Sequence, residues 1–79
     1  MRMARHKPVA RYVVCVGNRG YRASLIVRRI YRRLPDAVAE GRRMVRIVDE
    51  SGDDYLFPTE LFVPIELPGA VERAFAAAR

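Results

Sequence analysis

The amino-acid sequence predicts a small, mainly β domain, because three of its segments have the pattern of β-strands. The first is the apolar run Val9–Val16, which a Gly- and Asn-containing turn follows. The second is residues 44–58, in which β-branched and aromatic residues flank an acidic turn. The third is Val63–Leu67, a short apolar segment near the C-terminus. With 79 residues the chain is long enough for one domain.

Residues 1–8 are predicted to be a flexible basic arm, since Lys7-Pro8 disfavours a helix, and residues 9–79 to be a single domain. The first residues lack the apolar core of a secretory signal. No apolar run reaches the length of a membrane span. We therefore expect a cytoplasmic location and no contact with a membrane.

Cys15 is the single cysteine, so an internal disulfide is excluded. Cys15 and His6 alone cannot complete a Cys/His zinc site, and no metal or cofactor is expected. A cysteine within an apolar strand is more often an inert core residue than a nucleophile. The domain must therefore be stabilised by packing, with self-association as a further contribution.

Residues 24–34 fit two patterns. As a helix, the segment would place its apolar residues on one side and its arginines on the other, with Ser24 as a cap and Pro35 as a stop. As a strand, it would turn Leu25, Val27 and Tyr31 inward. Periodicity slightly favours the helix, which would give an α+β fold.

The hairpin Met44–Phe57 is the firmest prediction. Gly52 supplies the positive φ that a tight turn requires, and Pro58 either ends the second strand or places it at an edge of the sheet. The acidic turn lacks the ligand order of an EF-hand, so we expect a solvated turn. In the two strands Val45, Ile47, Tyr55 and Phe57 alternate with Arg46, Val48, Asp54 and Leu56, the period of two expected of strands.

Three shorter elements complete the prediction. A polar connection over 35–43 contains one helical turn that ends at Gly41. Residues 59–62 form a 3₁₀ or helical turn after Pro58. A helix over 69–79 follows Pro68 and is too short to be stable alone, so Phe75 is expected to pack beside Ile65 or Leu67.

The charges are unevenly distributed along the chain. Residues 1–46 contain 13 Arg or Lys and two acids, whereas residues 47–79 contain two Arg and seven acids. Arginine supplies 14 of the 15 basic residues, and its guanidinium suits bidentate contacts with phosphates and carboxylates. One interpretation is a basic face for nucleic acid or an acidic partner. The other is that the two halves pair and their charges meet across strands.

Several motifs together resemble a family of small, functionally uncharacterised bacterial and phage-encoded proteins. The matching pattern begins with a cysteine in the first strand and an Asn-x-Gly-Tyr turn, and ends with an Asp-Glu-Ser-Gly-x-Asp-Tyr-Leu-x-Pro hairpin. The matching residues, within about Val13–Pro68, are Cys15, Asn18, Gly20, Tyr21, Leu25, Val27, Tyr31, Asp49, Glu50, Ser51, Gly52, Asp54, Tyr55, Leu56, Pro58 and Phe62.

This resemblance implies a small five-stranded barrel of the Src-homology-3-like (SH3-like) class with a short C-terminal helix. It favours a strand within 25–34, arranged around a diverging turn, over the helix. The chain departs from the family pattern at Arg28-Arg29, where the family has Gly-Lys at the turn. The resemblance implies no activity.

No motif of an enzyme is present in the sequence. It contains neither a P-loop nor a GxGxxG motif, and Ser24 and Ser51 have no histidine partner for a triad. The paired carboxylates lie in an exposed turn, where nothing would raise a pKa for acid catalysis. We therefore expect no catalytic residues and a non-enzymatic protein.

Two functions remain. The first is a binding or interaction module with a protein partner or a second copy of the chain, in which Phe62 and Phe75 would lie at the interface. The alternative is a nucleic-acid-binding barrel with Tyr21 and Tyr31 as stacking faces. The arginines expected to contact nucleic acid or an acidic partner are Arg19, Arg22, Arg28, Arg29, Arg32, Arg33, Arg42 and Arg43.

Overall fold

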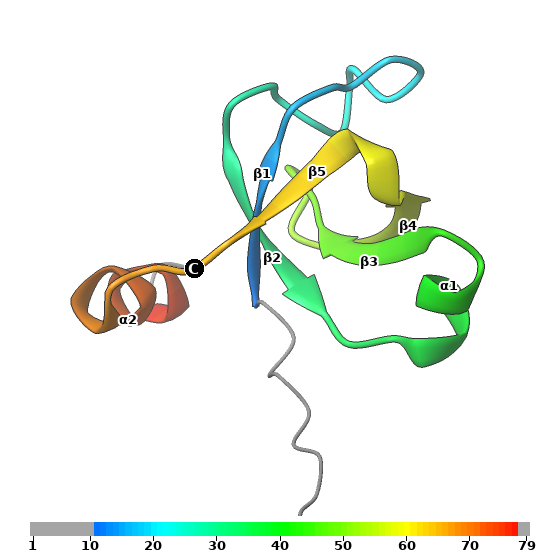
Figure 1. The fold of residues 1–79 in the computed structure, drawn as a ribbon. Helices are drawn as coiled ribbons and strands as arrows, with labels where there is room; N and C mark the ends of the chain where they lie inside the picture. Colours follow the sequence, from blue (N-terminus) through cyan, green and yellow to red (C-terminus); the bar gives the residue numbers. More distant parts are fainter. Residues whose placement is uncertain (1–10, 78–79) are drawn as a thin grey trace, which may run out of the picture.

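A computed structural model describes residues 11–77, which form one antiparallel five-stranded sheet with two short α-helices (Figure 1). The strands are β1 (Tyr12–Cys15), β2 (Ile30–Leu34), β3 (Met44–Val48), β4 (Asp54–Pro58) and β5 (Phe62–Ile65). The helices are α1 (Ala37–Gly41) and α2 (Gly69–Ala77), and a 3₁₀ turn, η1 (Thr59–Leu61), joins β4 to β5. The predicted arm over residues 1–8, and residues 78–79 of the predicted last helix, lie outside the described residues.

The strand order is β4-β3-β2-β1-β5, and each neighbouring pair is antiparallel. The mainly β prediction with five strands and a C-terminal helix is therefore confirmed. The alternative helix over 24–34 is wrong, because β2 occupies the second half of that segment and turns occupy the first. The outer strands β4 and β5 do not pair, so the sheet is not closed into a barrel.

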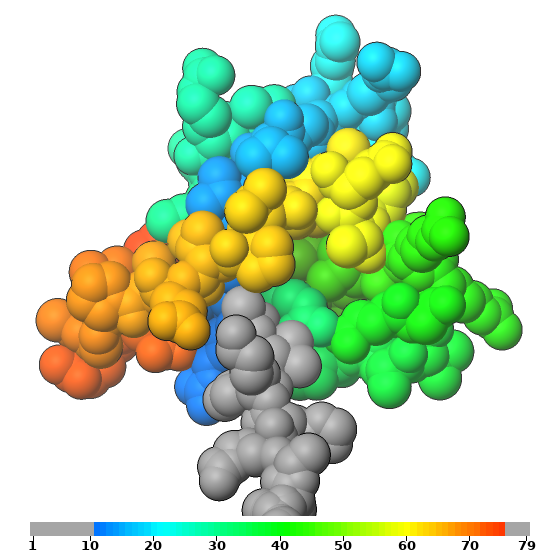
Figure 2. All heavy atoms as spheres, in the orientation of Figure 1, coloured from blue at the N-terminus to red at the C-terminus, as the bar shows by residue number. Residues whose placement is uncertain are grey.

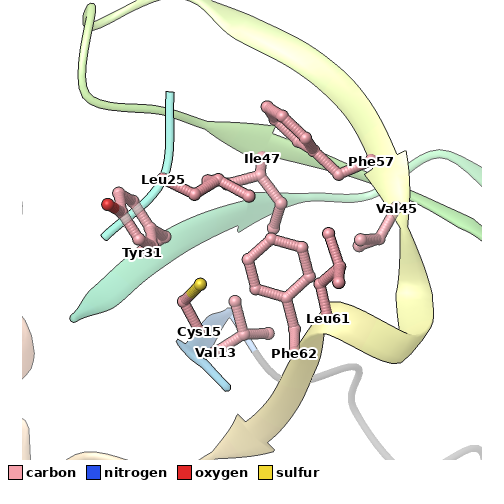
Figure 3. Packing of buried hydrophobic residues seen from close by; sticks show 9 residues of the cluster. All are labelled: Val13, Cys15, Leu25, Tyr31, Val45, Ile47, Phe57, Leu61 and Phe62. Atoms are coloured by element: carbon pink, nitrogen blue, oxygen red, sulfur yellow. The ribbon is translucent and has the colours of Figure 1, made fainter. Parts of the chain in front are cut away.

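One face of the curved sheet forms the core, where side chains from all five strands, the β1–β2 loop and η1 converge (Figure 3). Leu25 enters from the loop and is fully buried beside Ile47. The cluster consists of Val13, Cys15, Leu25, Tyr31, Val45, Ile47, Phe57, Leu61 and Phe62. Tyr55, in the same alternating set as Val45, Ile47 and Phe57, is 52% exposed. It lies opposite Ile47 on β4, the edge strand, and no further strand covers it.

The β1–β2 loop, residues 16–29, is a series of turns held by hydrogen bonds. The Asn18 side-chain amide donates to the Leu25 carbonyl at 3.0 Å. Arg28 has a φ of 74°, the left-handed conformation that favours glycine, and its N–H donates to the Cys15 carbonyl at 2.6 Å. An arginine thus occupies the left-handed position of this turn.

The β3–β4 hairpin follows the prediction. Gly52 has a φ of +90°, and Pro58 is the last residue of β4 at the edge of the sheet. Within the turn, the buried Asp49 accepts hydrogen bonds from the N–H and hydroxyl of Ser51. The Glu50 N–H donates to the Ser24 carbonyl at 3.1 Å, which ties this turn to the β1–β2 loop.

The helices lie at opposite sides of the sheet (Figure 1). Asp36 caps α1 by accepting from the Ala39 N–H at 3.0 Å. Gly41 is the last residue of α1, as predicted, but the residue in the left-handed conformation is Arg43, with a φ of 63°. In α2, the ring of Phe75 packs edge-to-face on Tyr12 of β1, with ring centroids 5.6 Å apart. Tyr12 is the cross-strand partner of Ile65, so the ring partner of Phe75 lies on the strand next to the predicted one, and packing against Ile65 or Leu67 stays a prediction.

Candidate binding groove

Several arginines have a carboxylate partner within the fold. Arg29 pairs with Glu50 at 3.1 Å, and Arg46 pairs with both Asp36 at 2.9 Å and Asp54 at 3.0 Å. Arg33 pairs with Glu40, and Arg11 with Glu72 at 3.5 Å. Arg29–Glu50, Arg46–Asp54 and Arg11–Glu72 join the basic first half of the chain to the acidic second half. Pairing between the halves therefore accounts for part of the charge pattern.

The other arginines predicted to contact a partner are exposed and make no ion pair within residues 11–75. This set consists of Arg19, Arg22, Arg28, Arg32, Arg42 and Arg43. An exposed guanidinium without an internal partner can bind a carboxylate or phosphate of another molecule without first breaking an ion pair.

Three of these arginines line two adjoining hollows on either side of η1. The first hollow, about 490 Å³, lies between η1 and the β1–β2 loop, and the second, about 390 Å³, lies between η1 and the end of α1. Figure 2 shows η1, in yellow, between the loop in cyan and α1 in green. We call the two hollows together the η1 groove.

The first hollow is lined by Gly17, Asn18, Arg19, Arg22, Val27, Pro58, Glu60 and Leu61. The second is lined by Glu40, Arg43, Pro58, Thr59 and Glu60. Pro58 and Glu60 belong to both linings, so one extended ligand could cross η1 and contact both hollows. Val27, Pro58 and Leu61 supply apolar surface, and the arginines supply donors for an acidic group.

Backbone hydrogen bonds fix the segments around the groove. The Val16 and Gly17 N–H groups donate to the Leu61 carbonyl at 2.8 and 3.3 Å, which attaches η1 to the β1–β2 loop. On the other side, the Thr59 N–H donates to the Arg43 carbonyl at 3.0 Å. The left-handed φ of Arg43 is part of this connection. The groove is therefore preorganised, which lowers the entropic cost of binding.

Glu60 gives the groove a mixed charge. Its exposed carboxylate lines both hollows and makes no ion pair within residues 11–75. Arg19 and Arg22 lie on one side of it and Arg43 on the other. Glu40 also lines the second hollow, where it pairs with Arg33. The positive charge is thus concentrated at the loop side.

The structure corrects two predicted contact residues. Tyr31 is 5% exposed; its hydroxyl donates to the Glu50 carboxylate and accepts from the Ile26 N–H at 2.8 Å. Burial, together with the Glu50 contact, raises the pKa of Tyr31 to about 12. Phe62 is also in the core, at 7% exposed. Tyr31 therefore offers no stacking face, and Phe62 no surface for an interface, because both side chains fill the interior.

The other predicted residues are distributed over the surface. Tyr21 is half-buried and packs edge-to-face on Phe57 with ring centroids 5.2 Å apart. Phe75 is 39% exposed on α2. Arg32 lies on the outer face of the sheet in the register of Tyr12, away from the groove. Of the predicted contact residues, Arg19, Arg22 and Arg43 line the η1 groove.

The sequence pattern did not indicate that Glu60, Pro58 and Asn18 would line a groove. The signal available was the predicted turn after Pro58, but nothing in the sequence showed that this turn would lie between the two arginine-containing loops. That proximity arises because β5 pairs with β1, which brings Leu61 to Val16.

The remaining chemistry is sparse. Cys15 is fully buried and donates to the Gly17 carbonyl at 3.1 Å, and burial raises the pKa of its thiol. Residues 11–77 contain no cluster of three or more His, Cys, Asp or Glu that could hold a metal ion. Neither α1 nor α2 has the length and hydrophobicity of a membrane span, and the described part of the chain has no other α-helix.

Comparisons with protein-family models, with curated proteins and with solved structures found no match to this chain.

Proposed function

We propose that the protein is a small non-enzymatic interaction module that binds an extended segment of a partner protein in the η1 groove. One observation carries the proposal: Arg19, Arg22 and Arg43 make no ion pair within residues 11–75 and line adjoining hollows across a backbone-anchored turn. Carboxylates of the partner would form the ion pairs with these arginines. Exposed pairs of this kind contribute specificity and association rate more than affinity.

We also propose that the sheet belongs to the SH3-like class of small barrels. The observations in favour are the five antiparallel strands, the order β4-β3-β2-β1-β5 and the 3₁₀ turn that precedes the last strand. The sheet curls around one core, although β4 and β5 do not pair. A groove between the first long loop and η1 is a natural binding position on such a sheet, since loops at one end of a rigid scaffold are where ligands bind.

The nucleic-acid alternative is less well supported by the groove. A phosphate chain crossing η1 would pass the carboxylate of Glu60, which repels it. Tyr31, one of the two aromatic residues expected to stack on bases, is buried. Exposed arginines also lie outside the groove, for example Arg28 and Arg32, and they could bind phosphates. Nucleic-acid binding is therefore included as one outcome of the test.

The test is a titration of isotope-labelled protein followed by two-dimensional NMR. The probes are a short blocked peptide of alternating Glu and Ala and a single-stranded oligonucleotide. We expect the peptide to shift the amide signals of the β1–β2 loop, Arg43 and η1. Replacing both Arg19 and Arg22 by Gln should weaken peptide binding by about tenfold, since each exposed charge pair contributes roughly 0.5–1 kcal/mol.

The matched control is Arg32→Gln, which removes another exposed arginine, also without an ion pair within residues 11–75, from the outer face of the sheet. Peptide affinity should not change in this variant. If the oligonucleotide bound more tightly than the peptide, with a steep salt dependence, the nucleic-acid function would replace the proposed one. If neither probe moved the groove signals, the groove would have no binding role.

A further inference from the structure

The two hollows of the η1 groove differ in charge. The hollow beside the β1–β2 loop has the guanidinium groups of Arg19 and Arg22, neither of which makes an ion pair within residues 11–75, against the carboxylate of Glu60. The hollow beside α1 has Arg43 against Glu60 and Glu40, and Glu40 is neutralised by Arg33. The groove thus changes from net positive at its loop side to nearly neutral at its α1 side, where the Glu60 carboxylate has no ion-pair partner in the described part of the chain.

Glu60 is the residue that causes the difference in charge between the two hollows. It lies on the turn between the hollows and lines both, so a ligand that crosses η1 must pass it. A carboxylate of the ligand placed beside Glu60 would be repelled, whereas a lysine or arginine there would form an ion pair. Charged groups at an interface act chiefly by excluding partners with the wrong sign at a given position.

We infer that the η1 groove selects a peptide segment with both signs of charge. An acidic residue of that segment would bind Arg19 and Arg22, and a basic residue a few positions away would bind Glu60. The preferred partner is thus neither a uniformly acidic peptide nor a phosphate chain. This inference rests on the proposed function, because it specifies the chemistry of the segment bound there.

The Pro58 surface between the hollows supports an extended ligand. Pro58 lines both hollows and has a φ of −60° and a ψ of 133°, which presents its ring as a rigid apolar surface. A small apolar residue between the two charged positions of the ligand would rest there. The expected segment is therefore acidic, then apolar, then basic, or the same order read in the opposite chain direction.

The test compares three blocked peptides of equal length by titration calorimetry, with NMR to confirm that each binds in the groove. One peptide is acidic at one end and basic at the other, with Pro and Ala between; the second is acidic throughout, and the third basic throughout. Wild-type protein should bind the two-sign peptide about fivefold more tightly than the acidic one, since one favourable pair replaces one repulsion. The basic peptide should bind most weakly.

Glu60→Lys should invert this order, so that the acidic peptide binds more tightly than the two-sign peptide. Glu60→Gln should bring the two affinities close together. The matched control is Glu66→Lys, which makes the same charge change at an exposed position between β5 and α2, outside the groove lining. This control should keep the wild-type order of the peptides and so exclude an effect of net charge.

The inference is overturned if wild-type protein binds the acidic peptide as tightly as the two-sign peptide, or if Glu60→Lys leaves the order unchanged. Either result would still leave a peptide-binding groove. Absence of groove shifts with all three peptides would instead overturn the proposed function itself. The peptide affinities of a variant are compared with those of the wild type only if its two-dimensional NMR spectrum shows that the variant is folded.

Discussion

Arg28 and Arg43 are the non-glycine residues with a positive φ in residues 11–77. A left-handed backbone costs an ordinary residue about 1 kcal/mol. In both cases the conformation serves a hydrogen bond: the Arg28 N–H donates to Cys15, and the Arg43 carbonyl accepts from Thr59. Both side chains are exposed and make no ion pair within residues 11–75. Glycine would meet the backbone requirement with less strain.

Arg43→Gly is accordingly expected to stabilise the fold and weaken the groove. We expect the free energy of unfolding to rise by about 0.5–1 kcal/mol, because glycine adopts this φ without strain. Affinity for the acidic peptide should fall. Urea denaturation and the peptide titration measure the two effects.

Arg42→Gly is the control, because Arg42 is exposed next to Arg43 but has an ordinary φ of −109°. Its replacement should destabilise the fold slightly, since glycine adds chain entropy without relieving strain. A loss of stability in Arg43→Gly equal to that in Arg42→Gly would show that the backbone strain at Arg43 is negligible.

Tyr31 makes stability depend on alkaline pH. Its folded-state pKa, raised to about 12, lies above the value of 10.0 for the unfolded chain. The contribution of Tyr31 is therefore complete below pH 10 and is lost as the pH rises toward 12. The loss should amount to about 2 kcal/mol, measured by urea denaturation across this range.

Tyr31→Phe should remove this component. At neutral pH the variant should be about 1–2 kcal/mol less stable, because Glu50 and the Ile26 N–H lose their hydrogen-bond partner. Its stability should then fall less steeply with pH than that of the wild type. If the free energy of unfolding fell equally steeply with alkaline pH in Tyr31→Phe and in the wild type, the pKa of Tyr31 would not be raised in the folded state.

The helix α2 is attached to the rest of the fold by few side-chain contacts. It is attached through the edge-to-face contact of Phe75 with Tyr12, at 5.6 Å, and through the exposed Arg11–Glu72 pair. Phe75 remains 39% exposed and Val71 38%. A helix of nine residues has little stability of its own, so its order depends on these contacts.

Phe75→Ala should therefore cost about 1 kcal/mol, the value of an aromatic pair, and not the 3 kcal/mol or more of a fully buried phenylalanine. Loss of helical circular dichroism should accompany this change while the dispersion of the sheet signals is kept. Phe75→Leu, which keeps an apolar contact without the ring, should show an intermediate effect. A decrease in sedimentation coefficient with Phe75→Ala would instead place Phe75 at a contact between two copies.

The elements that could be predicted from the sequence are those specified by nearby residues. The β3–β4 hairpin depends on Gly52, Pro58 and the alternation between them, and all three act locally. The exposure of individual side chains depends on distant strands and was predicted less well. Tyr55 is exposed because β4 is an edge, and Phe62 is buried because β5 pairs with β1.

The residues of the candidate site, too, could be predicted only in part, because their ion pairs depend on distant segments. The sequence identified Arg19, Arg22 and Arg43 as unusual, because basic residues greatly exceed acids in the first half of the chain. It could not separate them from Arg29 and Arg33, whose carboxylate partners come from distant or looped segments. Only the folded arrangement shows which guanidinium groups stay free.

At the scale of the whole molecule, β1 lies between β2 and β5 and completes the core. A chain that ends at Glu66 should keep the sheet and lose only α2. A chain that ends at Leu61 should unfold, because it lacks Phe62 and the strand that pairs with β1. Signal dispersion in two-dimensional NMR distinguishes the two truncations, and a folded chain ending at Leu61 would show that β5 is dispensable.

The pairing of β1 with β5 also sets an order of events during synthesis. β1 emerges first, yet one of its two partners is the last strand of the sheet. The hairpin β3–β4 can form early because its contacts are local, whereas the β1–β5 contact requires closure of the long segment between these two strands. Until then, Val13 and Cys15 belong to an apolar strand with one uncovered edge, which is open to strands of other nascent chains. Synthesis and pairing of β5, rather than formation of the hairpin, is the step that covers this edge.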